Sequence, residues 1–161
     1  MSSEKRKIAY IDGKPYEIGA NHTSILKFVK SYVGEKKVPT LCDDPNLAPY
    51  GACRVCSVEV ALEKDGPTKM VASCHTPVAE NQHIFTSNEA ITSLRKNIVE
   101  LVLTDHPMEC DSCEVNNNCE LQTVANDLGI SDHRYNSPKQ HKGIPRDTSH
   151  DYMRMNLDNC I

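Results

Sequence analysis

Residues 50–56, YGACRVC, decide how the whole chain is interpreted. Two cysteines stand three positions apart behind the small pair Gly51-Ala52. Such a spacing occurs in metal-binding loops, redox dithiols and disulfides, so its meaning depends on the other cysteines. The 161-residue sequence contains eight cysteines. Its polar start, MSSEKRK, leads into no apolar segment of a secretory signal. We therefore expect a reducing, cytoplasmic setting, in which cysteines serve as metal ligands or catalytic thiols rather than disulfides.

The composition indicates a small core and argues against nucleic-acid binding and against a membrane span. Hydrophobic residues make up 39% of the chain and aromatic residues 5%, so bound metal can supply part of the folding free energy. A formal net charge of −4 argues against a nucleic acid held through its phosphates. No run of about 18 apolar residues is present, so we expect no direct membrane span. The expected location is the cytoplasm or the cytoplasmic face of a membrane complex.

The first half of the sequence predicts an α+β domain over residues 1–86. Polar and apolar residues alternate around Asp12-Gly13, a pair typical of a tight hairpin turn. A helical pattern follows, which begins after Thr23 or Ser24 and ends at Gly34. After a long loop, the alternation of apolar residues predicts three further strands, within residues 54–62, 68–73 and 83–87.

The second half changes to helical periodicity and predicts a small helical domain over residues 87–129. Thr86 and Glu89 form a candidate capping box for its first helix. The expected apolar stripe of this helix is Ile91, Leu94, Ile98, Leu101 and Val102. A cysteine-rich loop leads to a second helix that ends at Gly129. Its expected apolar face is Leu121, Val124, Ala125 and Leu128. Residues 130–161 form a polar, aperiodic tail.

Four cysteines of the first domain have a spacing that suits one metal centre. The pattern C-x10-C-x2-C-x17-C is formed by Cys42, Cys53, Cys56 and Cys74. Plant-type [2Fe–2S] ferredoxins use the related layout C-x4-C-x2-C…C. Gly51 and Ala52 let backbone N–H groups approach the sulfurs, and Arg54 is placed to stabilise a reduced, negative cluster. A structural zinc site with four cysteines stays open, although zinc ribbons usually present two C-x2-C pairs. We expect His75 to face solvent rather than to act as a ligand.

A second group of candidate ligands lies between the two predicted helices. The pattern H-x3-C-x2-C-x5-C is formed by His106, Cys110, Cys113 and Cys119. Cys119 stands at the start of a helix, where the helix dipole favours an anionic ligand. Three thiolates and one imidazole suit either a [4Fe–4S] cluster or tetrahedral zinc, and the spacing does not separate these two. His106, which precedes a proline at a helix end, can also serve as a helix C-terminal partner.

The two patterns in this order resemble the N-terminal iron–sulfur region of one family. That family includes the large iron–sulfur subunit of respiratory complex I and the small diaphorase subunit of NAD-reducing hydrogenases. It also includes the electron-input regions of NAD-linked [FeFe]-hydrogenases and NAD-linked formate dehydrogenases. The resemblance is carried by PYGACRVCSVEV, LRKNIVELVLTDHPMEC and NCELQ, and it covers nearly the whole chain.

The resemblance implies a β-grasp, plant-type-like [2Fe–2S] ferredoxin domain followed by a small helical [4Fe–4S] domain and an irregular tail. The first cluster would be held by Cys42, Cys53, Cys56 and Cys74, and the second by His106, Cys110, Cys113 and Cys119. In this family a two-cluster ferredoxin-like domain usually follows. The final RMNLDNCI is similar to its first residues, with Cys160 either its first ligand or a free thiol.

The function that the resemblance implies is electron relay within an NAD(P)-linked oxidoreductase complex. The partners would be a flavin-containing NAD(P)-binding subunit, docked near the first domain, and a catalytic or further iron–sulfur subunit. The chain itself contains no nicotinamide-binding G-x-G-x-x-G after a strand and no evident catalytic set, so we expect no substrate-converting site. The basic residues of the tail are expected at a solvated or subunit-facing surface; they are Arg134, Lys139, Lys142, Arg146 and Arg154.

Two other functions remain open from the sequence. One is an interaction module that binds two zinc ions and has no redox role. The other is an independent soluble ferredoxin, which would be a stable monomer, whereas a subunit would expose a docking face. Metal identity separates the zinc-binding module from both iron–sulfur alternatives.

Overall fold

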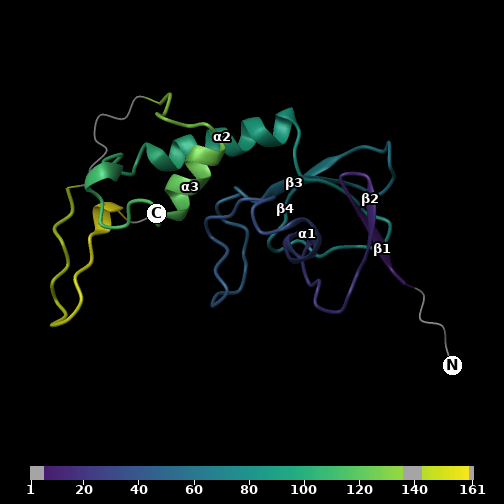
Figure 1. Cartoon of the computed structure of the whole chain (residues 1–161), viewed down its shortest axis with the longest axis horizontal. Coiled ribbons are helices and arrows are strands. Elements are labelled where there is room, and N and C mark those ends of the chain that lie inside the picture. The colour runs from purple at the N-terminus through teal and green to yellow at the C-terminus, as the bar shows by residue number, and fades with distance from the viewer. Residues whose placement is uncertain (1–5, 136–142, 160–161) are drawn as a thin grey trace. The chain divides into compact units, whose positions relative to one another are not determined.

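The computed structural model describes residues 6–135 and 143–159. Its contacts divide the chain into two compact units, one up to Arg95 and one from Lys96. Each unit is described by itself below, and Figure 1 labels the helices α1 to α3 and the strands β1 to β4. Three residues singled out from the sequence, Lys139, Lys142 and Cys160, lie outside the described residues.

The first unit is built on a mixed sheet of five strands with the order β2-β1-β5-β3-β4. The strands are β1 (Ile8–Ile11), β2 (Lys14–Glu17), β3 (Ser57–Ala61), β4 (Lys69–Ala72) and β5 (His83–Phe85). The pairs β1–β2, β3–β4 and β3–β5 are antiparallel, and β1 pairs with β5 in parallel. Asp12 and Gly13 both have positive φ, 48° and 83°, as a type I′ turn requires. The predicted hairpin and the three later strands are thereby confirmed.

The helix α1 (Ile25–Val33) supplies the second half of the core of this unit. Ser24 accepts a hydrogen bond from the Lys27 backbone N–H at 3.3 Å, and Gly34 closes the helix with φ 99°. Both predicted ends of the helix are confirmed. The core joins apolar side chains of this helix to those of the sheet; it contains Ala9, Ile11, Ile25, Leu26, Phe28, Val29, Val58, Ala72 and Ile84. The predicted α+β class is confirmed.

The long helix α2 (Glu89–Leu103) begins differently from the prediction. Its N-terminal side-chain cap is Asn88, whose Oδ1 accepts from the Ile91 N–H at 2.8 Å. Thr86 is not the cap, because its hydroxyl donates instead to Asp12 Oδ2 at 2.6 Å. The same carboxylate accepts from the Thr86 N–H at 2.8 Å, which fixes the end of β5 beside the hairpin turn.

The buried face of α2 is also rotated from the predicted stripe. Residues at a spacing of four are buried along the helix; they are Ile91, Arg95, Val99 and Leu103. By contrast, Leu101 is 54% exposed. The expected stripe was wrong at Leu101 because the buried positions recur at a spacing of four from Ile91, and the neighbouring Glu100 is buried as well.

The second unit contains short elements around a loop. They are the 3-10 turn η1 (Cys110–Ser112), the helix α3 (Glu120–Asp127) and the 3-10 turn η2 (Leu157–Asn159). Leu121, Val124 and Ala125 are buried on one face of α3, and Gly129 follows its end with φ 67°. In the tail, Asp147 and Met155 pair in an antiparallel bridge. Among the described residues, no helix has both the length and the apolar character needed to cross a membrane.

Candidate metal centres

The first candidate centre lies at one end of the β3–β4 pair. Cys42 and Cys53 belong to the loop between α1 and β3, Cys56 directly precedes β3, and Cys74 follows β4 by two residues. The backbone carbonyl of Cys56 accepts from Ser73 Oγ at 2.7 Å and from the Ser73 N–H at 3.3 Å. These bonds hold the Cys56 and Cys74 backbones side by side. Both side chains are buried, with 1% and 2% exposed, whereas Cys42 and Cys53 are half-buried.

The thiols of this site influence one another. Burial is the largest cause that raises the pKa of Cys74 to about 12, and the nearby Cys56 and Cys42 side chains and the Asp43 carboxylate contribute to the same rise. A hydrogen bond with Cys56 acts in the same direction. Three of the four predicted ligands are thus within electrostatic reach of one another, and Cys53 stands three positions before Cys56 on the same loop. Cation binding would relieve this crowding, because a coordinated thiol is deprotonated and its charge is neutralised.

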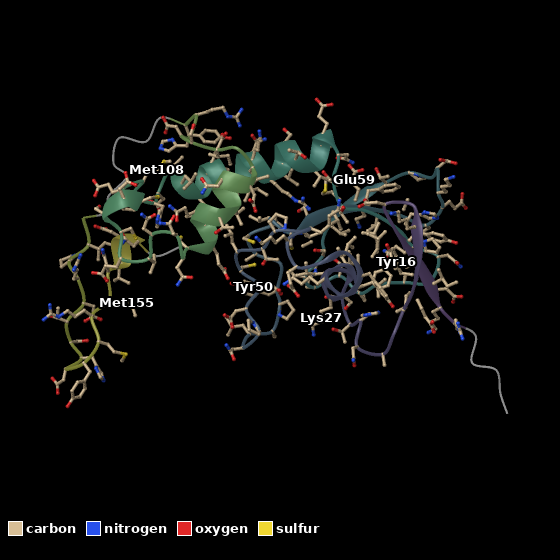
Figure 2. All side chains as sticks on the ribbon, in the orientation of Figure 1. Tyr16, Lys27, Tyr50, Glu59, Met108 and Met155 are labelled. Carbon is tan, nitrogen blue, oxygen red and sulfur yellow. The ribbon has the colours of Figure 1, made fainter. Side chains whose placement is uncertain are left out.

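The backbone of the loop follows the path that the small residues predicted. Gly51 is buried with φ 69°, in the region that favours glycine. A Cβ atom at this position would lie 3.2 Å from His75 Cδ2 and 3.3 Å from Ala72 Cβ. Arg54 also has positive φ, 63°, and its carbonyl accepts from Ser57 Oγ at 2.6 Å. The exposed position of His75 agrees with the prediction. Tyr50, labelled in Figure 2, is 63% exposed on this loop.

One charged residue of this region was missed in the sequence. Arg95 of α2 is only 5% exposed and donates from Nη2 to the Ser57 carbonyl at 2.8 Å. Burial lowers its pKa to about 10, while the nearby Cys56 side chain acts in the opposite direction. The signal that could have found it is the spacing of four that places Arg95 between Ile91 and Val99 on one helix face.

The second candidate centre is a cavity of about 390 Å³ in the second unit. All four predicted ligands line it: His106, Cys110, Cys113 and Cys119. The chain positions them by short elements: His106 follows α2, Cys110 begins η1, and Cys119 is the N-cap residue of α3. The Cys113 N–H donates to the Cys110 carbonyl at 3.1 Å, which closes the turn between these two ligands. Each of the four side chains is half-buried.

The tail contributes part of the wall of this cavity, which the sequence did not indicate. Arg146, Asn156, Asp158 and Asn159 line it together with the candidate ligands. Two backbone hydrogen bonds between Asp147 and Met155, of 2.9 and 3.0 Å, fold this tail segment back on itself; Met155 is labelled in Figure 2. Arg146 is exposed, as expected, yet it also borders the cavity. Arg134 is exposed too, and it pairs with the buried Glu100 at 2.6 Å.

A smaller cavity of about 240 Å³ is lined by three of the same candidate ligands. His106, Cys110 and Cys119 line it, and its remaining walls are mostly apolar, with Leu103, Leu121, Ala125 and Ile130. A metal centre here would therefore have an apolar side, which limits access of water. In the part of the chain that the structure describes, no three His, Cys, Asp or Glu side chains form a group able to hold a single metal ion.

Two family models match the chain, one over each candidate centre. Residues 8–89 match the family model described as a 2Fe-2S iron-sulfur cluster binding domain. The chain belongs to this family. Residues 95–134 match the NADH-ubiquinone oxidoreductase-G iron-sulfur binding region, a 4Fe-4S model. The predicted family and the two predicted cofactors, one [2Fe–2S] and one [4Fe–4S] cluster, are confirmed. The first matched range contains Cys42 to Cys74, and the second contains His106 to Cys119.

Individual relatives agree with the family models. The alpha subunit of an NADPH-Fe(3+) oxidoreductase of Geobacter sulfurreducens is 34% identical over 137 residues, which are 85% of this chain and 15% of the relative. The HndD subunit of an NADP-reducing hydrogenase of Solidesulfovibrio fructosivorans is 34% identical over 157 residues, 94% of this chain and 25% of the relative. A subunit of the NADH-quinone oxidoreductase of Escherichia coli K12 is 34% identical over 133 residues, 81% of this chain and 14% of the relative. The chain therefore spans a quarter or less of these curated relatives.

The fold has a match among solved structures. A chain in the crystal structure of an NAD+-reducing [NiFe]-hydrogenase in the H2-reduced state superposes with a TM-score of 0.81 at 22% identity. The match covers 96% of this chain and 62% of that chain. At this identity the match bears on the fold, which is therefore common to both chains.

Proposed function

We propose that this chain relays electrons in an NAD(P)-linked oxidoreductase complex and converts no substrate itself. The observation that carries the proposal is the second cavity, where all four residues of the H-x3-C-x2-C-x5-C pattern line one space inside the range that matches a 4Fe-4S model. The three relatives named above are nicotinamide-linked oxidoreductases or hydrogenases by name. In such complexes an iron–sulfur region passes electrons between other centres, and the protein tunes and shields its clusters.

In the first unit, the proposed ligands of the [2Fe–2S] cluster are Cys42, Cys53, Cys56 and Cys74. The sheet supports this assignment because β3 and β4 fix the two buried cysteines beside each other. The loop that carries the other two bends at Gly51 with a positive φ, which brings its backbone close to the β4 end. The mixed sheet crossed by α1 agrees with a β-grasp, plant-type-like ferredoxin domain, which we propose for this unit.

In the second unit, the proposed ligands of the [4Fe–4S] cluster are His106, Cys110, Cys113 and Cys119. Their supports are the ends of two helices and the turn between them, so each ligand is held by regular structure on at least one side. A neutral imidazole in place of a thiolate removes negative charge from the site, which favours a higher reduction potential. The proposal is supported by the donor types, three thiols and one imidazole, and by their position around one cavity.

The proposed partners are a flavin-containing NAD(P)-binding subunit and a catalytic or further iron–sulfur subunit. The loop before the first centre suits a docking role because Leu47 and Tyr50 expose 62% and 63% of their surface there. Large apolar side chains that are exposed beside a redox centre favour contact with another protein. The expected setting of this complex is the cytoplasm or the cytoplasmic face of a membrane.

The test is a measurement of iron, zinc and acid-labile sulfide per chain, on protein produced with ample iron and purified without oxygen. About six irons with matching sulfide are expected for one [2Fe–2S] and one [4Fe–4S] cluster. About two zinc ions without sulfide would instead support the interaction module. Size-exclusion chromatography with a flavoprotein of the NAD(P)H-oxidising class then separates a relay subunit from an isolated ferredoxin, because only the subunit forms a stable complex with it.

A further inference from the structure

A buried positive charge lies beside the first centre and has no role in the proposed ligand set. Arg95 is 5% exposed on α2, and its Nη2 donates to the Ser57 carbonyl at 2.8 Å. Ser57 directly follows the proposed ligand Cys56, whose side chain is 1% exposed. The guanidinium is therefore fixed within one residue of a cluster ligand, in a part of the unit from which water is largely excluded.

One donor of this guanidinium has no acceptor among the described residues. The Nε atom of Arg95 is buried there and makes no hydrogen bond. A buried donor without an acceptor is costly, and a buried cation without a compensating negative charge is costlier. A buried arginine therefore stabilises the protein only when a negatively charged group lies close to its guanidinium. The sulfur of Cys56, a proposed cluster ligand, acts on Arg95 in the direction that favours the charged guanidinium.

We propose that Arg95 is the buried counter-charge of the [2Fe–2S] centre, a positioning residue that stabilises the reduced cluster and raises its reduction potential. Reduction adds a negative charge at the centre, and a fixed cation in a water-poor environment stabilises that charge strongly. Net charge, hydrogen bonds and exposure are the features that set the potential of such clusters. The inference rests on the proposed function only in that Cys56 ligates the first cluster.

Arg54 provides the natural comparison. It stands between the candidate ligands Cys53 and Cys56, and it is the residue that the sequence alone suggested for this role. The structure places its side chain at the exposed surface, where solvent and salt screen its charge. Removing either arginine changes the net charge equally, so a difference between the two variants reports burial rather than charge alone.

The experiment compares R95Q, R95K, R54Q and K96Q in the whole chain with both clusters present, after iron and sulfide analysis. K96Q is the matched control, since Lys96 is the next residue on α2. The readout is the midpoint potential of the [2Fe–2S] cluster by EPR-monitored titration, at low and at high salt. R95Q is expected to lower this potential more than R54Q does, and its effect should persist at high salt while that of R54Q fades. R95K should stay close to wild type, and the [4Fe–4S] potential should not change.

Two outcomes of this experiment would overturn the proposed role of Arg95. A fully loaded R95Q protein whose [2Fe–2S] potential equals that of K96Q would overturn it. Should R95Q fail to take up the cluster, R95K decides: a loaded cluster with a near-wild-type potential supports the role of charge. An R95K protein that takes up no cluster, or whose potential falls, shows that the guanidinium shape matters rather than its charge, which also overturns the proposal. Failure of the proposed function is seen separately, as wild-type protein that contains zinc and no sulfide.

Discussion

At the scale of single residues, the buried Cys74 thiol makes the stability of the first unit depend on pH. Burial, together with the nearby Cys56 and Cys42 side chains and the Asp43 carboxylate, raises the pKa of this thiol from 9.0 to about 12. Between those two pH values the unfolded chain releases the Cys74 proton and the folded chain keeps it. Unfolding then releases a proton, so the free energy of unfolding falls as pH rises, whereas below about pH 9 this contribution is fully present.

The corresponding prediction concerns the metal-free protein under reducing conditions. Urea unfolding at about pH 7.5 and about pH 10.5 should show a loss of stability at the higher pH. In C74S this loss should be smaller, because serine does not titrate in the range. Equal losses in the two proteins would mean that the Cys74 thiol is not stabilised in its protonated form by the fold.

His106 carries a second residue-scale prediction, for the other centre. In H106C a thiolate replaces a neutral imidazole and adds negative charge, so the [4Fe–4S] cluster should form but its potential should fall, on the order of 100 mV. EPR-monitored titration of this cluster measures the change. H133C, a cysteine introduced at another histidine of the same unit, is the control. An H106C protein with an unchanged potential would show that His106 is not a ligand.

Candidate metal ligands could be predicted from the sequence because metal binding requires particular residue types at characteristic spacings. The seven cysteines and one histidine proposed as ligands follow from their spacing in the sequence, and a glycine at position 51 permits the positive φ that the structure shows there. Arg95 was not predictable in the same way, because a charged side chain in a helix is normally solvated. Only the packing of α2 against the start of β3, visible in the Arg95–Ser57 hydrogen bond, shows that it is buried.

At the scale of elements, the start of α2 shows where a local rule fails. The capping-box pattern fits Thr86 and Glu89, but Asp12 lies near in space through the sheet and binds Thr86 by two hydrogen bonds. The helix is capped by Asn88 instead. The strands and α1 were predictable because their signals are local: alternation, a tight turn, a serine cap and a terminal glycine.

This correction gives an element-scale prediction. N88A should lower the free energy of unfolding by about 1 kcal/mol, since alanine cannot accept the hydrogen bond from the Ile91 N–H. Asn88 also donates to Glu59 Oε2 at 3.0 Å, so E59Q is the control that weakens this second bond alone. Chemical denaturation of both variants measures the difference. A larger effect in E59Q than in N88A would contradict the assignment of Asn88 as the cap.

At the scale of the whole molecule, the order of the two centres was predictable and the role of the tail was not. The change from alternation to helical periodicity separates an α+β part from a helical part in the sequence. The tail has no such periodicity, so its backbone pairing between Asp147 and Met155 could not be inferred. Its polar side chains Arg146, Asn156 and Asp158 nevertheless border the second cavity. Residues of an aperiodic segment can line a site because the folded chain brings them near it, and no periodicity in the sequence predicts this.

The division into two units predicts that the two clusters form independently. The proposed ligands of one cluster all lie before Arg95, and those of the other all lie after Lys96. C53S should therefore abolish the [2Fe–2S] EPR signal and leave the [4Fe–4S] signal at wild-type intensity. C113S should do the reverse. Circular dichroism establishes that each variant is folded, because unfolding would remove both signals for a trivial reason.

The two variants C53S and C113S together distinguish independent from coupled cluster assembly. Each variant is the control for the other, since both replace a half-buried cysteine by serine and differ only in the unit affected. If a folded C53S protein lost both signals, the [4Fe–4S] cluster would depend on the first unit, and the assignment of two separate ligand sets would be wrong. If only the expected signal is lost in each, each unit assembles its own cluster from its own ligands, as a relay with two successive centres requires.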